Sequence, residues 1–403
     1  MSTTETTTAD VAAPACTHFG LAVTALAMGG FAIGTTEFVS MGLLPQIAHG
    51  VHESNPTTGH AISTYALGVV VGAPVLAYYG ARLPRRALLM ALMAAFAIGN
   101  LLSALAASYH VLLVARFASG LPHGAYFGVA SLVAASLADP ARRGRAVALV
   151  MLGLSVANVI GVPVATWLGQ QLSWRAAYVL VGALGLATIA LIRAYIPEIP
   201  GDANATGRRE LSLFAVPQVW LTLLVGAIGF GGMFAVYTYI SPTITDIGHL
   251  SKGTVPVFLA AFGIGMVFGT WLAGELADWS IMRSLFIGSL GMGAVLLLYW
   301  VAAPHGWWAL PVVFAITTLG SVLVVNLQLR LMNVAGPAQT LGAAMNHASL
   351  NIGNALGAWL GGIAVDHGGY RDPALVGVAL SLAGAVVLTV SALVHVRGRE
   401  RAA

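Results

Sequence analysis

The sequence predicts an all-α polytopic membrane protein, with 12 transmembrane helices arranged as two parallel six-helix repeats. Three observations carry this prediction. Charged residues make up only 8% of the 403-residue chain, whereas about a quarter of a soluble domain is charged. Uncharged stretches long enough to cross a bilayer follow one another along almost the whole chain. Short motifs of the first half recur in the second half at a nearly constant offset.

The composition excludes several classes of protein before any motif is considered. The 18 basic and 14 acidic residues are too few to cover a water-facing surface, which excludes a soluble enzyme and a disordered protein. The net charge of +4 comes from scattered arginines, and no basic run is long enough to follow a nucleic-acid backbone. The single cysteine, Cys16, excludes a disulfide framework and any CxxC site. We therefore expect no nucleic-acid partner, no metal and no cofactor.

Eleven uncharged runs of at least 17 residues fit transmembrane helices, which need about 20 apolar residues each. The runs are 11–36, 54–81, 87–115, 117–138, 146–174, 176–192, 211–245, 253–274, 284–329, 331–365 and 373–396. The run 284–329 is 46 residues long and contains the turn signal Pro304-His305-Gly306, so it holds two helices and the total becomes twelve. Strands of a barrel would be shorter and would alternate in polarity.

The arginines are distributed very unequally between the two sides of the predicted membrane. Fourteen follow the even-numbered spans or close the chain, and three basic residues lie on the other side: Arg175, Lys252 and Arg371. Cytoplasmic loops carry the excess of Lys and Arg. This bias predicts a multi-pass protein of the plasma membrane, the bacterial inner membrane, with both termini in the cytoplasm.

The two halves of the chain repeat one another. Three pairs of motifs are offset by 196 or 197 residues: Pro45 and Pro242, Asn158-x-x-Gly161 and Asn354-x-x-Gly357, and Trp174-Arg175 and Tyr370-Arg371. Because each half has six spans, both copies have the same orientation in the membrane. Parallel repeats of this kind enclose a substrate cavity that opens to one side at a time.

The repeats and the runs together predict five segments of the chain. They are a disordered cytoplasmic tail at 1–17, an N-terminal six-helix bundle at 18–196, a cytoplasmic linker at 197–215, a C-terminal six-helix bundle at 216–396 and a basic cytoplasmic tail at 397–403.

Several motifs resemble the twelve-span drug:proton antiporters of the major facilitator superfamily. The likeness covers the run 31–45 in span 1, Arg116-x-x-Ser119-Gly120 in span 4, where the family has Arg-x-x-Gln-Gly, and Asn346-His347 in span 11. Within the family, the chain most resembles the subgroup of the arabinose efflux permease AraJ and actinobacterial chloramphenicol-resistance exporters. The resemblance implies the major facilitator fold and the efflux of a drug or a sugar, driven by protons.

The family's cytoplasmic gating motif is present in one half only. Gly274-Glu275-Leu276-Ala277-Asp278, with a trailing Arg283, resembles the loop signature Gly-x-Leu-Ala-Asp. In the first half, Ala81 stands where the family has an aspartate. The resemblance therefore implies that Gly274, Asp278 and Arg283 form the gate. The family's span 5 signature Gly-Pro-x-x-Gly-Gly is reduced here to Gly161-Val-Pro163.

Two charged residues lie inside predicted spans, Glu37 in span 1 and Arg116 in span 4. A charge at the centre of a bilayer costs about 3 kcal/mol or more, so each is a candidate for proton coupling. Both are expected at a similar depth in the outer half, where an ion pair fits the geometry; the alternative is a permanent structural pair. His123 in span 4 is a further candidate for carrying protons, and His347 in span 11 a weaker one; the alternative for both is packing.

Uncharged polar side chains inside the spans are the candidates for binding substrate. They are Asn158, Asn326, Gln328, Asn351, Asn354 and Tyr237. Amides suit a neutral or weakly polar solute. The alternatives are hydrogen bonds between helices, worth about 0.6 kcal/mol each, and for Tyr237 a place in the interfacial aromatic belt.

These features predict a secondary active transporter that works as a monomer in the lipid bilayer. We expect it to export a small neutral or weakly polar compound, such as chloramphenicol or a sugar, in exchange for protons by alternating access. A proton-coupled importer and a passive facilitator are alternatives. A membrane-embedded transferase is a distant one, because no HExxH motif or pair of acids is present, and we expect no enzyme activity.

Overall fold

The computed structural model describes residues 19–53, 55–201, 211–336 and 338–400. Within these ranges the chain forms helices joined by short turns and contains no strand. The tail 1–17, the middle of the linker at 202–210 and the last three residues of the basic tail lie outside the described residues.

Six spans form the N-terminal bundle. Its helices are α1 (Phe19–Gly42), α2 (Leu44–Val51), α3 (Asn55–Gly80), α4 (Arg85–Ala104), α5 (Tyr109–Leu137), α6 (Arg143–Val156), α7 (Val162–Gln171) and α8 (Trp174–Tyr195), with a 3₁₀ turn at Pro140–Arg142. A π-helical turn, Ala157–Gly161, joins α6 and α7 into one span. Pro163 follows this turn and has no N–H to continue the regular bonding, which accounts for the irregular turn before it.

The C-terminal bundle repeats this plan. Its helices are α10 (Pro217–Leu224), α11 (Gly231–Thr238), α12 (Ile240–Pro242), α13 (Val255–Ala302), α14 (Ala309–Val334), α15 (Gln339–Gly368) and α16 (Pro373–Glu400). Two π-helical turns, Val225–Gly229 and Thr243–Ile247, and three 3₁₀ turns, Ser212–Ala215, Lys252–Thr254 and Ala303–Trp308, connect them. α13 has 48 residues and holds two spans, because the backbone leaves the helical conformation at Ser280 (φ −171°, ψ 109°). The predicted turn at Gly306 separates α13 from α14, and the prediction of twelve spans is confirmed.

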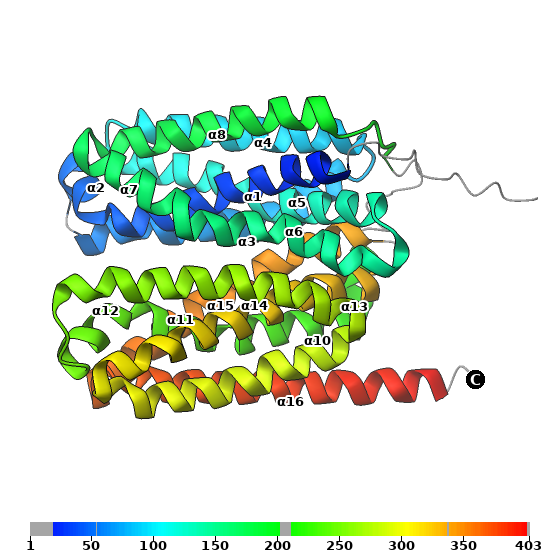
Figure 1. Ribbon diagram of the computed structural model, residues 1–403. Coiled ribbons are helices and arrows are strands. Elements are labelled where there is room, and N and C mark those ends of the chain that lie inside the picture. Colours follow the sequence, from blue (N-terminus) through cyan, green and yellow to red (C-terminus); the bar gives the residue numbers. More distant parts are fainter. Residues whose placement is uncertain (1–18, 54, 202–210, 337, 401–403) are drawn as a thin grey trace, which may run out of the picture.

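The two bundles lie side by side with their helices roughly aligned (Figure 1). α1 begins and α16 ends at the same end of the molecule, on the right in Figure 1, which we call the terminal end. The opposite end is called the far end. The α5–α6 connection and the bend at Ser280 lie at the terminal end, where most of the arginines in the described chain are found.

Matching contacts at the far end bear out the internal repeat. Arg175, which opens α8, donates a hydrogen bond from Nη2 to the carbonyl of Ala106 (2.9 Å). Its repeat partner Arg371 donates from Nε to the carbonyl of Trp300 (2.6 Å). Each guanidinium also lies over a tryptophan ring, that of Trp174 (4.3 Å) or Trp300 (3.6 Å). Each bundle therefore fastens its sixth span to the end of its third in the same way.

The outer faces of the helices are apolar, as a lipid environment requires. Eight stretches of the described chain are long and apolar enough to cross a membrane, and one of them, Val255–Val334, contains three spans. Large side chains such as Ile98, Leu186 and Val386 are more than half exposed on this surface. α5 and α15 are not among the eight stretches because polar residues interrupt them, and these two helices meet between the bundles.

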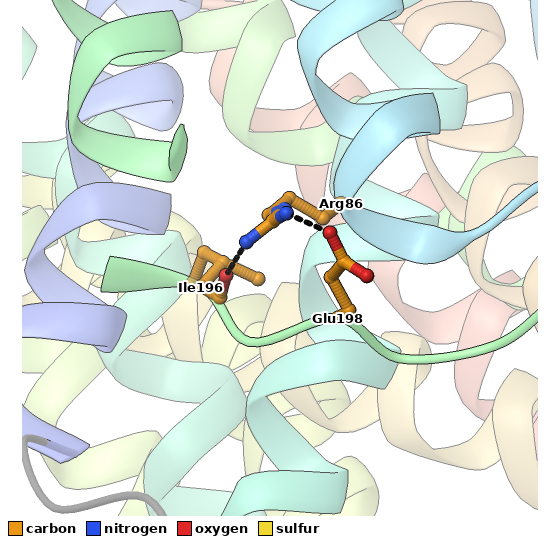
Figure 2. A network of polar contacts seen from close by, with 3 residues as sticks. All are labelled: Arg86, Ile196 and Glu198. Atoms are coloured by element: carbon orange, nitrogen blue, oxygen red, sulfur yellow. Dashed lines mark hydrogen bonds and ion pairs between the residues drawn. The ribbon is translucent and has the colours of Figure 1, made fainter. Parts of the chain in front are cut away.

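The described start of the linker is fastened to the N-terminal bundle (Figure 2). Arg86, in the first turn of α4, forms an ion pair with Glu198 and donates a hydrogen bond to the carbonyl of Ile196 (3.4 Å). The backbone N–H of Arg85 donates to the carbonyl of Ile199 (2.9 Å). This part of the chain therefore lies against the terminal end of α4.

Candidate functional site

A cavity with about 760 Å³ of empty space lies between the two bundles. Most of its wall is apolar, and aromatic and methionine side chains dominate it: Phe38, Phe230, Met233, Phe234, Phe262 and Met266. Its polar groups are few and come from both bundles: Glu37, Ser155, Thr270, Ser321, Asn351 and Asn354, together with His347. Such a site suits a compact, largely apolar molecule with a small number of polar groups.

Among the described residues of the cavity wall, Glu37 alone carries a carboxyl group. It lies in the outer part of α1, next to Phe38, and is partly exposed to the cavity. Within the described chain the structure gives its carboxylate no hydrogen bond and no ion pair within 4 Å, so its oxygens are free to meet a proton or a ligand.

Arg116 is fully buried in the N-terminal bundle, where it contacts the residue of α1 that precedes Glu37. Its guanidinium donates to the hydroxyl of Thr36 (2.9 Å) and to the carbonyl of the same residue (3.3 Å). The sequence allows an ion pair between Arg116 and Glu37, and the structure does not form it. Arg116 is instead held on the neighbouring residue of α1, one position away from the acid.

Aromatic rings complete the surroundings of Arg116. Its guanidinium lies over the ring of Tyr65 at 4.3 Å and over that of Tyr178 at 5.4 Å. Such cation–π contacts contribute about 2 kcal/mol when they are desolvated. The Thr36 hydroxyl in turn donates to Oδ1 of Asn100 (2.6 Å). This network explains how an unpaired guanidinium stays inside a membrane bundle.

His123 and His347 meet across the interface between the bundles. Nε2 of His123 lies 3.2 Å from Nδ1 of His347, and Nδ1 of His123 lies 3.0 Å from the hydroxyl of Tyr65. The ring of Phe127 stacks on His347 at 4.3 Å. Both histidines are almost fully buried, with 1% and 4% exposure. This hydrogen bond is a polar contact between α5 and α15 in the interior of the protein.

The amide candidates from the sequence divide into two groups. Asn351 and Asn354 line the cavity. Asn326 and Gln328 are fully buried in helix packing, away from the cavity wall. Asn326 donates to Val322 of its own helix (2.9 Å), and Gln328 donates to Ser131 of the other bundle (3.2 Å).

The other two candidates lie beside the cavity rather than on its wall. Asn158 donates to the carbonyl of Leu154 on its own span (3.1 Å). Tyr237 packs its ring against Phe262, with 4.3 Å between the ring centres, and so supports a residue that does line the cavity.

We call the contact between α6 and α13 the latch seam, because polar groups close it towards the terminal end. Oδ1 of Asp278 accepts a hydrogen bond from the backbone N–H of Gly144 (3.0 Å), in the first turn of α6. This bond joins the acid of the motif 274–278 to the helix that begins the other side of the seam. Burial raises the pKa of the Asp278 carboxyl, and the N–H groups of Gly144 and Arg145 oppose that shift. An anion at a helix N-terminus is stabilised by the helix dipole.

Two further pairs join the latch seam. Arg145 forms an ion pair with Glu275 (2.5 Å), and the hydroxyls of Ser155 and Thr270 lie 2.8 Å apart at the edge of the cavity. At Gly274 a Cβ atom would lie 2.9 Å from that of Ala148, so the absence of a side chain allows the close approach of α13 to α6.

Arg283, the third residue of the expected gate, has a different neighbour. Its guanidinium lies over the ring of Trp279 (5.0 Å), on the same element of the C-terminal bundle.

We call the contact of α3 and α5 with α15 the histidine seam. Towards the terminal end it is apolar, with a buried cluster that includes Ala73, Ala77 and Leu341. At Gly128 a Cβ atom would lie 2.8 Å from the carbonyl oxygen of Thr340 and 2.9 Å from the nitrogen of Ala344. The backbones of α5 and α15 are therefore almost in contact. Both seams close the terminal end of the cavity.

The family model for the Major Facilitator Superfamily matches residues 26–346 of this chain. The chain belongs to the Major Facilitator Superfamily. It is 39% identical to the inner membrane transport protein YdhP of Escherichia coli over 364 residues, 89% of this chain and 92% of the relative. It is 33% identical to the putative transporter AraJ of Escherichia coli, over 90% of this chain and 92% of that one. It is also 33% identical to a chloramphenicol resistance protein of Streptomyces lividans, over 85% and 88% of the two chains.

A solved structure shares the fold of this major facilitator protein. The proton:xylose symporter XylE superposes with a TM-score of 0.75 at 17% identity, over 92% of this chain and 94% of that one. The resemblance read from the sequence is thus confirmed. The protein is a multi-pass membrane transporter of small molecules, and the alternative of a membrane-embedded transferase is excluded.

Several functional neighbours escaped the analysis of the sequence. Tyr65, Thr36 and Asn100 hold Arg116 and His123, but hydroxyl, phenol and amide side chains are too common in spans to be noticed singly. Glu275 lies inside the recognised gating motif, at the position that the family signature leaves open, and so it was not singled out.

Proposed function

We propose that this major facilitator transporter exports a small neutral or weakly polar compound, with an apolar body, in exchange for protons. The observation that carries the proposal is a single carboxylate among the described residues, Glu37, on the wall of a mostly apolar cavity between the bundles. A proton and a substrate would use this cavity in turn, since Glu37 is the one acid that either of them meets there.

The lining of the cavity supports the substrate class. Phe230, Phe262 and Met266 offer aromatic and polarisable surface, and Asn351 and Asn354 offer amide donors and acceptors. A sugar presents hydroxyl groups over its whole surface, and most of this wall would leave them without partners. A drug such as chloramphenicol, which has an aromatic ring and few polar groups, fits the same wall better. The resistance protein of Streptomyces lividans is a relative whose name points to that compound.

The coupling scheme follows from the position of Glu37. Protonation removes the negative charge from the cavity before the bundles rearrange, and release of the proton on the other side prepares the site for the next molecule. Arg116, held on Thr36 one residue away, favours the charged form of Glu37 and so helps the proton to leave. Tyr65 connects Arg116 to His123: its ring lies under the guanidinium of Arg116, and its hydroxyl pairs with Nδ1 of His123.

The excess of arginines supports an assignment of the terminal end to the cytoplasm, with the protein in the plasma membrane. Working as a monomer remains part of the proposal. With that orientation the present state is closed to the cytoplasm. Gly274 and Asp278 of the latch seam would form the cytoplasmic gate, and Arg283 would anchor its loop.

Everted membrane vesicles with an imposed pH gradient test this proposal. Chloramphenicol, arabinose and a purine nucleoside are added in turn, and the collapse of the gradient is followed for the wild type, Glu37→Gln and the matched control Glu53→Gln. We expect chloramphenicol to collapse the gradient in the wild type and in the control. In Glu37→Gln the rate of collapse should be at least about tenfold lower, which corresponds to ~1.4 kcal/mol.

Four outcomes contradict parts of the proposal. Collapse with arabinose alone would overturn the substrate class, and an undiminished rate in Glu37→Gln would remove Glu37 from the coupling. Uptake of labelled chloramphenicol without any movement of protons would identify a passive facilitator, and proton-driven accumulation in whole cells would identify an importer.

A further inference from the structure

We propose that His123 and His347 form one shared proton site across the interface of the bundles, and that loading this site opens the terminal end of the cavity. Their hydrogen bond is the central observation, since its two members belong to different bundles, on α5 and α15. Opening of the terminal end must break it. This inference rests on the proposed function in one respect, the step of the transport cycle at which the histidine pair takes up its proton.

The hydrogen bonding of the pair leaves one nitrogen without a partner. Nδ1 of His123 pairs with the Tyr65 hydroxyl and Nε2 of His123 pairs with Nδ1 of His347. Nε2 of His347 is buried and has no hydrogen-bond partner within the described part of the chain, while His347 itself lines the cavity. Because Nδ1 of His347 faces His123 and His347 lines the cavity, this nitrogen is the atom of the pair that is left to take up a proton from the cavity.

The bond between the rings limits how many protons the pair can hold. A neutral imidazole carries one N–H, and a single hydrogen lies between the facing nitrogens. When His347 donates through Nδ1, its Nε2 has a free lone pair and takes up one proton from the cavity, which leaves the bond intact and gives the pair a charge of about +1. A second proton would place hydrogens on both facing nitrogens, and the bond would be lost.

The surroundings of the pair disfavour even the first charge while the seam is closed. Phe127 of α5 covers His347, and Tyr65 of α3 separates His123 from the guanidinium of Arg116. The described residues of α11, α13 and α14 that line the same cavity are apolar or carry hydroxyls, and the polar side chains of α15 beside His347 on that wall are amides. Glu37 of α1, the one acid among the described residues of that wall, forms no ion pair with either ring.

A cation buried in this position is stabilised when water reaches it. Separation of α5 from α15 provides that water, because the two helices are in close contact beside the pair at Gly124 and again at Gly128. The proton enters from the cavity at Nε2 of His347, stays on the imidazolium while the seam opens, and leaves to the water that fills the opened end.

The test follows the distance between the bundles without any substrate. Cys16→Ser removes the native thiol, and Ala141→Cys and Asn333→Cys place spin labels on exposed residues of opposite bundles at the terminal end. The purified protein in lipid nanodiscs is titrated from about pH 8 to about pH 5, the range in which histidine changes its charge. We expect the population with separated labels to rise by about tenfold, or ~1.4 kcal/mol, towards low pH.

Variants separate the pair from other titrating groups. His123→Gln and His347→Gln should lose the rise, while His367→Gln, an exposed histidine at the far end, should keep it. Tyr65→Phe leaves both rings in place but removes the partner of His123, and it should move the midpoint of the rise without abolishing it. A wild type whose distances do not change with pH, or a rise that survives in both pair variants, would overturn the proposal.

Glu37→Gln distinguishes this inference from the proposed function. It should keep the pH-dependent separation and lose the collapse of the gradient in vesicles. Separation that disappears in Glu37→Gln alone would assign the pH response to the acid and overturn the shared histidine site. Failure of the vesicle assay, with the separation intact, would instead contradict proton-coupled export and leave the histidine site standing.

Discussion

The latch seam and the histidine seam close the same end of one cavity with different chemistry. At the latch seam, near the surface, Asp278 of α13 accepts a hydrogen bond from the backbone N–H of Gly144 of α6, and Arg145 forms an ion pair with Glu275. At the histidine seam, α5 and α15 approach through glycine and alanine, and the polar contact is buried beside the cavity. The repeats share a fold, yet the contacts that hold them together have diverged, and Ala81 in place of an acid belongs to that divergence.

The difference has a physical consequence for how each seam responds. Charges near the surface interact weakly and are screened by salt. A close-packed seam depends on shape and is insensitive to salt, and its buried ionisable pair responds to protons. The histidine seam therefore carries the larger share of the closing energy, and the latch seam adjusts the balance.

The largest effect is expected from Gly128→Leu in the histidine seam. The new side chain would meet the backbone of α15, at Thr340 and Ala344, which cannot move aside as a flexible side chain can. We expect the terminal end to stay open and transport in vesicles to fall to the background. Gly59→Leu is the matched control, because a Cβ atom at Gly59 meets nothing within 4 Å. Wild-type transport by Gly128→Leu would show that this close approach is not needed.

A moderate effect is expected from Asp278→Asn in the latch seam. The amide oxygen still accepts from the Gly144 N–H, but the negative charge at the N-terminus of α6 is lost, which costs about 0.3–1 kcal/mol. The closed population, measured with the spin labels at neutral pH, should fall by up to about fivefold. Asp246→Asn, an exposed acid near the far end, should leave the population unchanged. An equal fall in the closed population in both variants would show that the effect does not come from the Asp278 contact.

The smallest effect is expected from Glu275→Gln. The side chains of Arg145 and Glu275 are 47% and 37% exposed, and such a pair contributes about 0.2–1 kcal/mol at low salt. The same distance measurement should show a small loss of the closed state that disappears in concentrated salt. A loss larger than that of Asp278→Asn, or one that salt does not reduce, would reverse the order of the two contacts.

The spans could be predicted from the sequence because uncharged runs in a bilayer have few alternatives to helix. The turn at Pro304-His305-Gly306 could also be predicted, because proline and glycine mark turns. In the structure Gly306 has a positive φ of 58°, which glycine adopts readily. The break between α1 and α2 and the π-helical turns were not predicted. They depend on how neighbouring helices restore the bonds that prolines and glycines disturb, and that information is not local.

Residues of the candidate site could be predicted from the sequence only where their type is rare in a membrane span. Glu37 and Arg116 stood out because charges are rare in spans, and Asn351 and Asn354 were singled out as amides near the middle of span 11. Depth in the membrane follows from position in the sequence, but the face that a residue presents depends on helix rotation. Gln328 therefore shares the chemistry of the cavity amides and yet bonds to Ser131 inside the packing. The pairing of His123 with His347 likewise needed the arrangement of the two bundles.

The central claim is that substrate and proton use one cavity in turn, and purified protein in sealed liposomes tests it most directly. The vesicles are loaded with the compound that collapses the gradient in membranes, with no initial difference in pH, and an internal pH dye follows the protons as the compound leaves. The account predicts that the outward flow of substrate drives protons inward against a growing gradient, and that Glu37→Gln abolishes this movement. Substrate that drains at the same rate while the internal pH stays constant would contradict it.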